Sequence, residues 1–406
     1  TSLTSAAISL IYGPINAASE AIKQLVANEV KLAMVSVALD TSLVSTDKVF
    51  SDVYNSAQKA GESVSGVIDA FGAAYTAAGR ITNEVDRYNS TIKLMDDALV
   101  LSKISTLDQA GAIDVLTAAL YQTAEAQETG VSASDTAADA LARGTDLIDQ
   151  WVLVSRNASV SVETLATGVA VLGDSAETAG LTLAQLNSMV AVLSEVSLSA
   201  GKETANIAKA LIGNYQQESA VKELNRLGIA VVDTTGKTRQ FLDVMRDVAA
   251  LRSSGLLGDP DFSRLTLALG GGGIRRQKDV SAFIENFSRM EQLTKIQEAG
   301  AGGQSQMAMA KTLDTVQTSS TRLMNSVTEL AQTLGTDGGL LDAFSMIIDV
   351  GTKLVEVIDK IASAVGRVGP LLLAVGVGSL LMRGKGGALG MQSMMMNNLG
   401  MGGLSS

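Results

Sequence analysis

Histidine and cysteine are absent from this chain of 406 residues. Without histidine, the chain lacks the commonest general base and metal ligand. Without cysteine as well, thiol catalysis, disulfides, zinc sites built on cysteine and histidine, and a Ser-His-Asp triad are all excluded. We therefore predict that the chain is not an enzyme, and we assign no catalytic, cofactor-binding or metal-ligating residue to it.

Proline and aromatic residues are scarce, with three prolines and 3% aromatic residues. Few prolines permit long helices, because proline removes a backbone donor and clashes with the preceding turn. Few aromatics argue against a thick globular core, since aromatic side chains carry much of the buried area in most cores. Small and aliphatic residues dominate instead, which suits thin helix-on-helix packing. The composition therefore predicts an all-α fold.

Basic residues are outnumbered by acidic ones, 31 against 42, which gives a net charge of −11. A protein that binds DNA non-specifically is expected to carry a basic face. We therefore expect no specific nucleic-acid binding. Residues 1–30 have no basic start followed by an apolar run, so we expect no secretory signal peptide there.

Residues 1–101 carry a heptad pattern. When Ile8 is taken as position a and Ile11 as position d, almost every later a and d position is apolar. An unbroken period of 3.5 residues predicts a long left-handed coiled-coil helix, of about 140 Å at 1.5 Å per residue. The exceptions to the pattern are Glu29, Ser36 and Thr46.

The heptad pattern does not fix how many helices form the coiled coil or where this helix begins. Isoleucine at both a and d near the beginning favours three strands. Pro14 is an alternative start for the helix, because proline is tolerated in a first helical turn. A single long amphipathic helix within a bundle is the alternative to a coiled coil.

Residues 102–298 carry shorter helical patterns and predict a compact helical domain. Thr182 and Gln185 have capping-box spacing in front of one of these helices. Trp151, the only tryptophan, is interpreted as an anchor of the core. The expected helices are 105–125, 135–154, one from about 161 through 171, 183–198, one through 211, one closing at 227, and 280–298.

Three short motifs resemble ligand sites, and each has a simpler interpretation. Residues 235–238 (TGKT) resemble the end of a phosphate-binding loop, but Val231 stands where that loop requires glycine. Residues 229–241 therefore predict a small β-hairpin that turns at 235–236. Asp259 and Asp261 lack the loop of about 12 residues that binds calcium, so Asp259-Pro260 is interpreted as the start of a turn.

The four glycines at 270–273 are followed by Arg275 and Arg276. Successive backbone amides can cradle an anion. No GxGxxG spacing or preceding strand supports a dinucleotide site. We therefore predict a flexible turn or a close backbone approach at 270–273.

The C-terminal part of the chain changes character. Residues 299–303 (AGAGG) predict a linker, and residues 299–360 predict a helical hairpin that turns at 335–339. Residues 361–406 form an apolar segment followed by a Gly/Met-rich tail. The uncharged run 368–382 is shorter than the roughly 20 residues of a spanning helix. Two interpretations of 361–382 remain open: a buried helix within an assembly, and a membrane-active segment.

The order of parts in residues 181–248 resembles the core domain of phage tail tape measure proteins. In that family a helix and a glycine-containing turn lead to a helix that ends in a Lys-Glu-Leu-Gly-Ile pattern. An Asp-x-x-Gly-Lys turn and an amphipathic helix follow. The resemblance extends with lower specificity over about 104–290. The matching residues are Leu183, Gly201, Lys222, Glu223, Leu224, Leu227, Gly228, Ile229, Asp233, Gly236 and Lys237.

This resemblance implies a structural virion protein that lies in the lumen of the tail tube or at the tail tip. Such a protein sets tail length and leaves ahead of the DNA, and it helps genome passage through the host envelope in some members. The implied partners are other copies of the chain (a trimer is favoured), tail tube and tail tip proteins, tail assembly chaperones and, through 361–382, a host membrane.

Two alternatives come from other function classes. A helical membrane-perturbing, pore-forming protein is the main alternative, because it accounts for the helices and the apolar segment but not for residues 181–248. A cell-wall hydrolase carried in a tail would need two carboxylates across a cleft, and no such setting is recognisable.

Overall fold

The computed structural model describes residues 27–28, 30–31, 33, 43–124, 133–198, 201–313, 318, 321–322 and 325–326. The chain divides into two compact units, one formed by Thr1–Glu29 with Thr315–Ser406 and the other by Val30–Asp314. Every helix described below belongs to the second unit. The heptads before residue 27, the predicted hairpin beyond Leu313 and the segment 361–406 lie outside the described residues or in isolated fragments of them.

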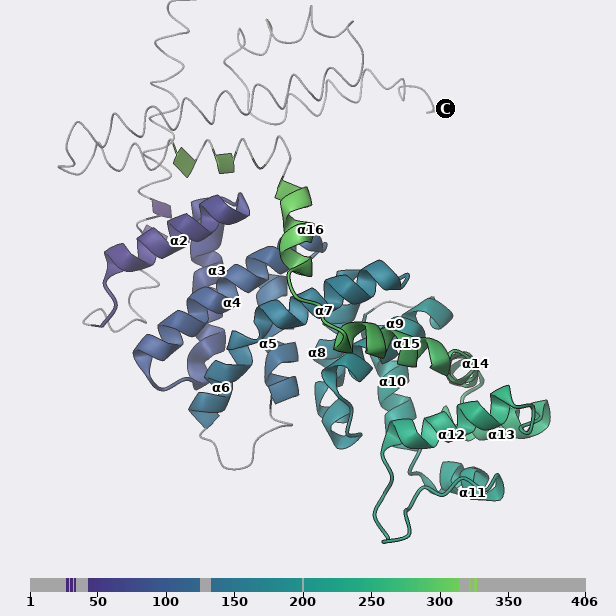
Figure 1. The fold of residues 1–406 in the computed structure, drawn as a ribbon. Helices are drawn as coiled ribbons and strands as arrows, with labels where there is room; N and C mark the ends of the chain where they lie inside the picture. The colour runs from purple at the N-terminus through teal and green to yellow at the C-terminus, as the bar shows by residue number, and fades with distance from the viewer. Residues whose placement is uncertain are drawn as a thin grey trace, which may run out of the picture. The chain divides into compact units, whose positions relative to one another are not determined.

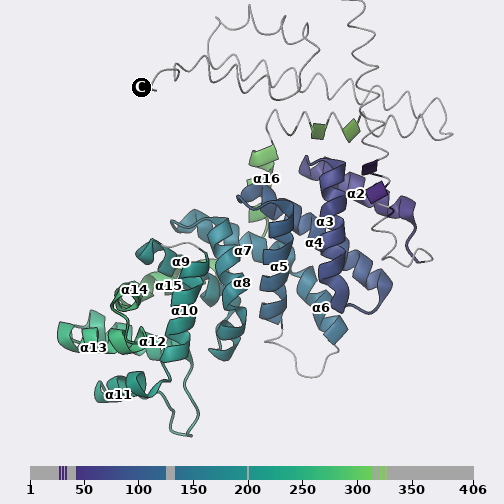
Figure 2. The ribbon, with the colours of Figure 1, turned by 180° about the vertical axis from the view of Figure 1, so that it is seen from behind.

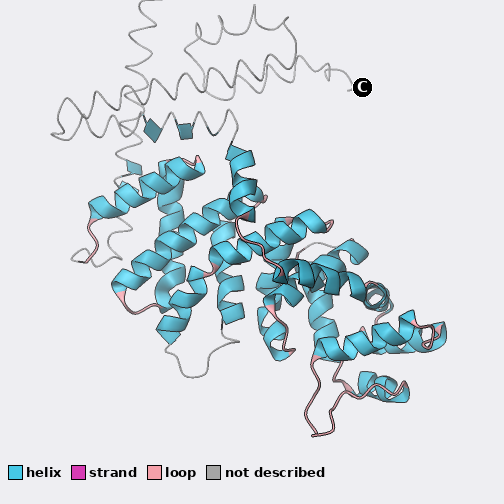
Figure 3. Cartoon of the chain, viewed as in Figure 1, coloured by secondary structure: helices cyan, strands magenta, loops and turns pink. Residues whose placement is uncertain are grey.

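The described residues are mostly helical, and no β-strand is found among them (Figures 1 and 3). This agrees with the predicted all-α class. The helices are α2 (Thr46–Ala60), α3 (Val64–Ala77), the 3-10 helix η1 (Ala78–Arg80), α4 (Glu84–Ile104), α5 (Gln109–Ala124), α6 (Ala133–Ala142), α7 (Gly144–Asn157), α8 (Val162–Thr178), α9 (Leu183–Ser197), α10 (Lys202–Asn214), α11 (Glu218–Arg226), α12 (Phe241–Ser253), α13 (Asp259–Leu269), α14 (Ile274–Glu285), α15 (Phe287–Glu298) and α16 (Gln304–Leu313).

Residues 43–104 do not form the single coiled-coil helix that the heptads predicted. Gly61 ends α2 in a left-handed conformation, with φ of 62°. The Ser63 hydroxyl accepts from the amide of Gly66 and starts α3, and the Asn83 side chain starts α4. The three helices pack on one another, so their heptad-spaced apolar residues face neighbours in the same chain. The predicted helix is thus wrong over this part, because local caps divide it.

Polar contacts hold α2 on α4. The Tyr88 hydroxyl donates to Asp52 at 2.6 Å, and the Lys48 ammonium bonds the same carboxylate at 2.7 Å. Burial raises the pKa of Tyr88 well above its usual value, and the bond to Asp52 raises it further. Burial also raises the pKa of Asp52, but the hydrogen bonds from Lys48 and Tyr88 outweigh that effect and leave the pKa lowered. The two helices therefore share one ionised carboxylate.

Two predicted helices are each divided in two. The span 135–154 becomes α6 and α7, which meet at Arg143 and Gly144. The span 280–298 becomes α14 and α15, which meet at Asn286. By contrast, the capping box is confirmed, since the Thr182 hydroxyl accepts from the Gln185 amide at 3.2 Å and the Gln185 side chain accepts from the Thr182 amide at 2.8 Å.

The predicted β-hairpin at 229–241 is not confirmed. A single antiparallel bridge joins Val232 and Thr238, and no strand forms around it. Gly236 occupies the left-handed region with φ of 84°, and the Asp233 carboxylate accepts from the amides of Thr235 and Lys237. The turn itself is therefore present, but the flanking residues are too few to extend a ladder.

Candidate functional site

The four glycines at 270–273 form the turn between α13 and α14. Gly271 and Gly272 have φ of 72° and 81°, which side chains other than glycine rarely adopt. The Asn214 side chain, at the end of α10, donates to the Leu269 carbonyl at 2.9 Å. The prediction of a turn is confirmed, and this contact ties the turn to α10.

A surface hollow of about 420 Å³ lies beside this turn. Arg275 and Arg276 are exposed at its edge, where a bound anion could approach them. Glu203 and Asp279 line the same hollow, and both oppose a negative ligand. Burial raises the pKa of Asp279, although the charge of Arg275 lowers it. Because both signs of charge meet here, the hollow selects no ligand of one sign.

The two carboxylates considered for calcium do not converge on a common point. Pro260 lies in the first turn of α13, so Asp259 and Asp261 belong to a helix rather than to the predicted turn. Asp259 bonds Arg252 at 2.7 Å, whereas Asp261 bonds Arg226 at 2.9 Å. No cluster of three or more potential metal ligands occurs among the described residues.

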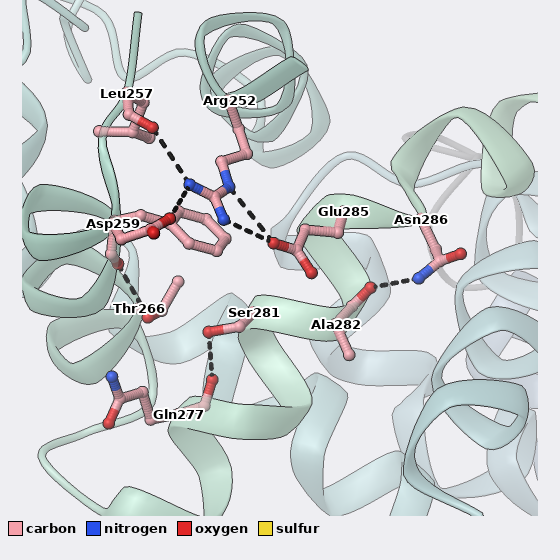
Figure 4. Close-up of polar contacts among 10 residues, drawn as sticks. Arg252, Leu257, Asp259, Thr266, Gln277, Ser281, Ala282, Glu285 and Asn286 are labelled. Atoms are coloured by element: carbon pink, nitrogen blue, oxygen red, sulfur yellow. Dashed lines mark hydrogen bonds and ion pairs between the residues drawn. The ribbon is translucent and has the colours of Figure 1, made fainter. Parts of the chain in front are cut away.

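Arg252 is the centre of a contact group between α12, α13 and α14 (Figure 4). Its guanidinium donates to Glu285 through two nitrogens at 3.2 and 3.0 Å, to Asp259 at 2.7 Å and to the Leu257 carbonyl at 3.3 Å. It also lies over the Phe262 ring, 4.3 Å from the ring centroid. The hydrogen bonds to Asp259 and then Glu285 raise the pKa of Arg252. This group fixes the connection between α12 and α13 onto α14.

The TGKT turn does not form a phosphate cradle. The Asp233 carboxylate occupies the turn amides, and its pKa is lowered by the hydrogen bond from the Thr235 hydroxyl and then by the amides of Lys237 and Thr235. No strand precedes the turn, and α12 begins only at Phe241. The amides that a phosphate would need are thus already bonded within the turn.

A buried polar network lies between α7, α9 and α15. The indole N–H of Trp151 donates to the Asn187 side-chain oxygen at 3.0 Å, and the Asn187 amide donates to Gln150 and Gln297 at 3.1 and 3.0 Å. Gln297 also donates to Ser188 at 2.8 Å. Trp151 is fully buried, so its interpretation as a core anchor is confirmed. Sequence reasoning missed its partners, although an Asn-Ser pair inside an apolar helix was the available signal.

A second hollow, of about 320 Å³, lies between α2, α4, α7 and α16. Asp97 lines it and is 5% exposed. Its carboxylate accepts from Lys93 at 2.6 Å and from the Thr145 hydroxyl at 2.7 Å. Burial raises the pKa of Asp97 in spite of these bonds. Gly144 lies against the same carboxylate, and a Cβ at this position would collide with it. A larger residue where α7 begins would therefore have to displace the Asp97 carboxylate.

A further carboxylate, that of Asp149 on α7, caps α16. It is 3% exposed, and its two oxygens accept from the amides of Gly303 and Ser305, both at 2.6 Å. An acidic group at a helix N-terminus satisfies amides that have no partner within the helix. The Asp149 carboxylate thus joins α7 to α16.

Comparison with known proteins found no matching family model, no matching curated protein and no matching solved structure. Within the described part of the chain, no helix has the length and apolar character needed to cross a bilayer. Among the described residues, the candidate functional feature is the helical body with its interhelical polar contacts.

Proposed function

We propose that this chain is a structural component of a phage virion, acting as a tail tape measure protein. The observation that carries the proposal is the order of elements over 181–248. There α9, a glycine turn, α10, α11, a second glycine, an Asp-x-x-Gly-Lys turn and α12 follow one another. This is the order of parts on which the resemblance rests.

The glycines of this pattern stand where the backbone needs them. Gly201, Gly228 and Gly236 have φ of 50°, 79° and 84°. Residues with a Cβ rarely adopt these conformations, so each glycine marks a fixed change of chain direction. Sequence pattern and backbone geometry agree at three separate positions, which supports the proposal more strongly than helix order alone.

Under this proposal the chain lies in the tail tube or at the tail tip and works through assembly rather than through chemistry. Its proposed partners are other copies of itself, tube and tip proteins and tail assembly chaperones. Membrane contact through 361–382 during genome passage is part of the same proposal, and it concerns residues outside the described ones.

Electron microscopy of tails from a phage with a nonsense mutation in this gene tests the proposal. We expect missing tails or tails of irregular length, restored to uniform length by the intact gene supplied in trans. Mass spectrometry should also detect the chain in purified wild-type tails. Uniform, normal-length tails made without the chain would overturn the proposal, as would its absence from purified wild-type tails.

A further inference from the structure

The helix α16 buries few of its residues against the body. Figures 1 and 2 show it beside α4 and α7, the helices on which it packs. Ser305 is its only buried residue, whereas Ala308 and Met309 are partly buried and Met307 is 50% exposed. Because burial of apolar surface is the main stabilising contribution to helix docking, α16 gains little from it.

The surface on which α16 packs, formed by α4 and α7, is also incompletely filled. Ser305, Gln306 and Met309 line the hollow of about 320 Å³ whose other walls come from α2, α4 and α7. Side chains that face a hollow lose the dispersion contacts that a packed neighbour would supply. The apolar contribution to docking is therefore smaller than the position of α16 beside two helices suggests.

Polar contacts at one end replace the missing apolar ones. The Asp149 carboxylate accepts from the amides of Gly303 and Ser305, and the Arg156 guanidinium donates to the Gln304 side chain at 2.5 Å. When α16 leaves, water can solvate the Asp149 carboxylate and the freed amides. A helix held mainly by such contacts can separate without exposing a large apolar surface.

The chain before α16 has the properties of a hinge. Gly300 and Gly303 have φ of 120° and 78°, and no atom approaches the positions where their Cβ atoms would lie. Gly302 is equally open but has an ordinary φ. Rotation within 300–303 therefore meets little steric resistance.

We propose that residues 299–313 form a detachable strap. The strap swings on the glycine hinge, α16 leaves its seat on α4 and α7, and the rest of the body stays folded. Its release opens the hollow that contains Asp97 and separates the amides of Gly303 and Ser305 from the Asp149 carboxylate. This inference rests on contacts of the strap and does not depend on the proposed function.

Thiol labelling of Ser305→Cys tests the strap, because the chain has no cysteine of its own. Ser305 is 1% exposed, so a maleimide reaches a thiol there only when α16 is released. Met307→Cys, half exposed on the same helix, reports the unhindered rate, and Val169→Cys, fully buried in α8, reports opening of the whole body. We expect Ser305→Cys to label about a hundredfold faster than Val169→Cys, since local opening costs less free energy than global unfolding.

Three further substitutions separate the strap from general destabilisation. Asp149→Asn replaces one of the two oxygens that accept from Gly303 and Ser305 by an NH₂ group, which cannot accept. It should raise the labelling rate of Ser305→Cys about tenfold, the factor expected for the loss of one hydrogen bond. Gly303→Ala, strained at φ of 78°, should also raise this rate, whereas Gly302→Ala should leave it unchanged. Labelling of Val169→Cys should respond to none of them. Equal labelling rates for Ser305→Cys and Val169→Cys would overturn the proposal of a detachable strap. Equal acceleration of both rates by Asp149→Asn would overturn it as well.

Discussion

In the described body, few buried side-chain nitrogen and oxygen atoms lack a hydrogen-bond partner. Asn187 is the clearest case, because its side chain forms hydrogen bonds with Trp151, Gln150 and Gln297 at the same time. A buried donor or acceptor that loses its partner pays its full desolvation cost. The network therefore specifies how α7, α9 and α15 fit together.

Asn187→Ala should lower the free energy of unfolding by about 2–4 kcal/mol, because the indole N–H of Trp151 loses its acceptor and a small cavity remains. Urea denaturation followed by tryptophan fluorescence measures this directly, since Trp151 is the only tryptophan. Asn225→Ala, at an exposed position of α11, is the matched control and should change stability by less than about 0.5 kcal/mol. Equal effects of the two substitutions would show that the network contributes nothing specific.

Asp97 predicts a pH dependence of stability. Burial raises its pKa in the folded chain above the ordinary 3.8, so the folded state binds a proton more readily than the unfolded state. This stabilising contribution is fully present below pH 3.8 and is lost as the pH rises through the folded pKa. Groups such as Asp52, with a lowered pKa, act in the opposite direction.

Comparison of the wild-type chain with Asp97→Asn isolates this contribution from the other groups. Relative to Asp97→Asn, the wild type should gain stability as the pH is lowered from neutral toward 4. Urea denaturation of both proteins across this range gives the difference at each pH. A difference that stays constant, or that favours the wild type more as the pH rises, would contradict the assignment of Asp97 as a carboxyl group with a raised pKa.

At the scale of elements, the sequence predicted the start of α9 correctly from the Thr182–Gln185 box. The caps at Gly61, Ser63 and Asn83 are equally local signals, but the heptad pattern over the same residues concealed them. The heptad count failed at 43–104 because periods of 3.5 and 3.6 residues differ by only about 20° per heptad. Helices as short as α2 and α3 span about two heptads, too few to distinguish the periods. The partners in the polar network and in the Asp149 cap were not predictable, since both depend on which helices become neighbours.

The connection between α12 and α13 depends on Arg252, so its removal should act on that connection first. Arg252→Ala loses bonds to Glu285, Asp259 and the Leu257 carbonyl and should destabilise the chain by about 1–2 kcal/mol, since these groups are partly solvated. Hydrogen exchange over 254–262 should accelerate.

Arg264→Ala is the control for Arg252→Ala. Arg264 is exposed and reaches Asp261 only at 3.8 Å, so its loss should stay within about 0.5 kcal/mol. Arg252→Lys should resemble Arg252→Ala, because an ammonium group cannot reproduce the planar set of donors. Full stability of Arg252→Lys would mean that charge alone, and not the fork of hydrogen bonds, fixes the connection.

At the scale of the whole molecule, the compact unit Val30–Asp314 changes how chain length relates to distance. A continuous helix converts each residue into about 1.5 Å. In the compact unit, consecutive helices such as α5 and α6 pack against each other, so added residues between them need not separate the ends of the unit. A ruler built from this unit in its folded form would not be linear in residue number.

Under the proposed function, an insertion between α5 and α6 distinguishes a folded unit from an extended one inside the tail. A helix-forming insert of 42 residues within 125–132 would lengthen an extended helical chain by about 60 Å, at 1.5 Å per residue. We expect no change in tail length by electron microscopy, because the insert begins and ends between two helices that stay in contact. An insert of the same composition but scrambled order is the control for the added bulk. Tails longer by about 60 Å with the helix-forming insert alone would show that α5 and α6 separate on assembly, and that the body unfolds into a ruler before the tail is complete.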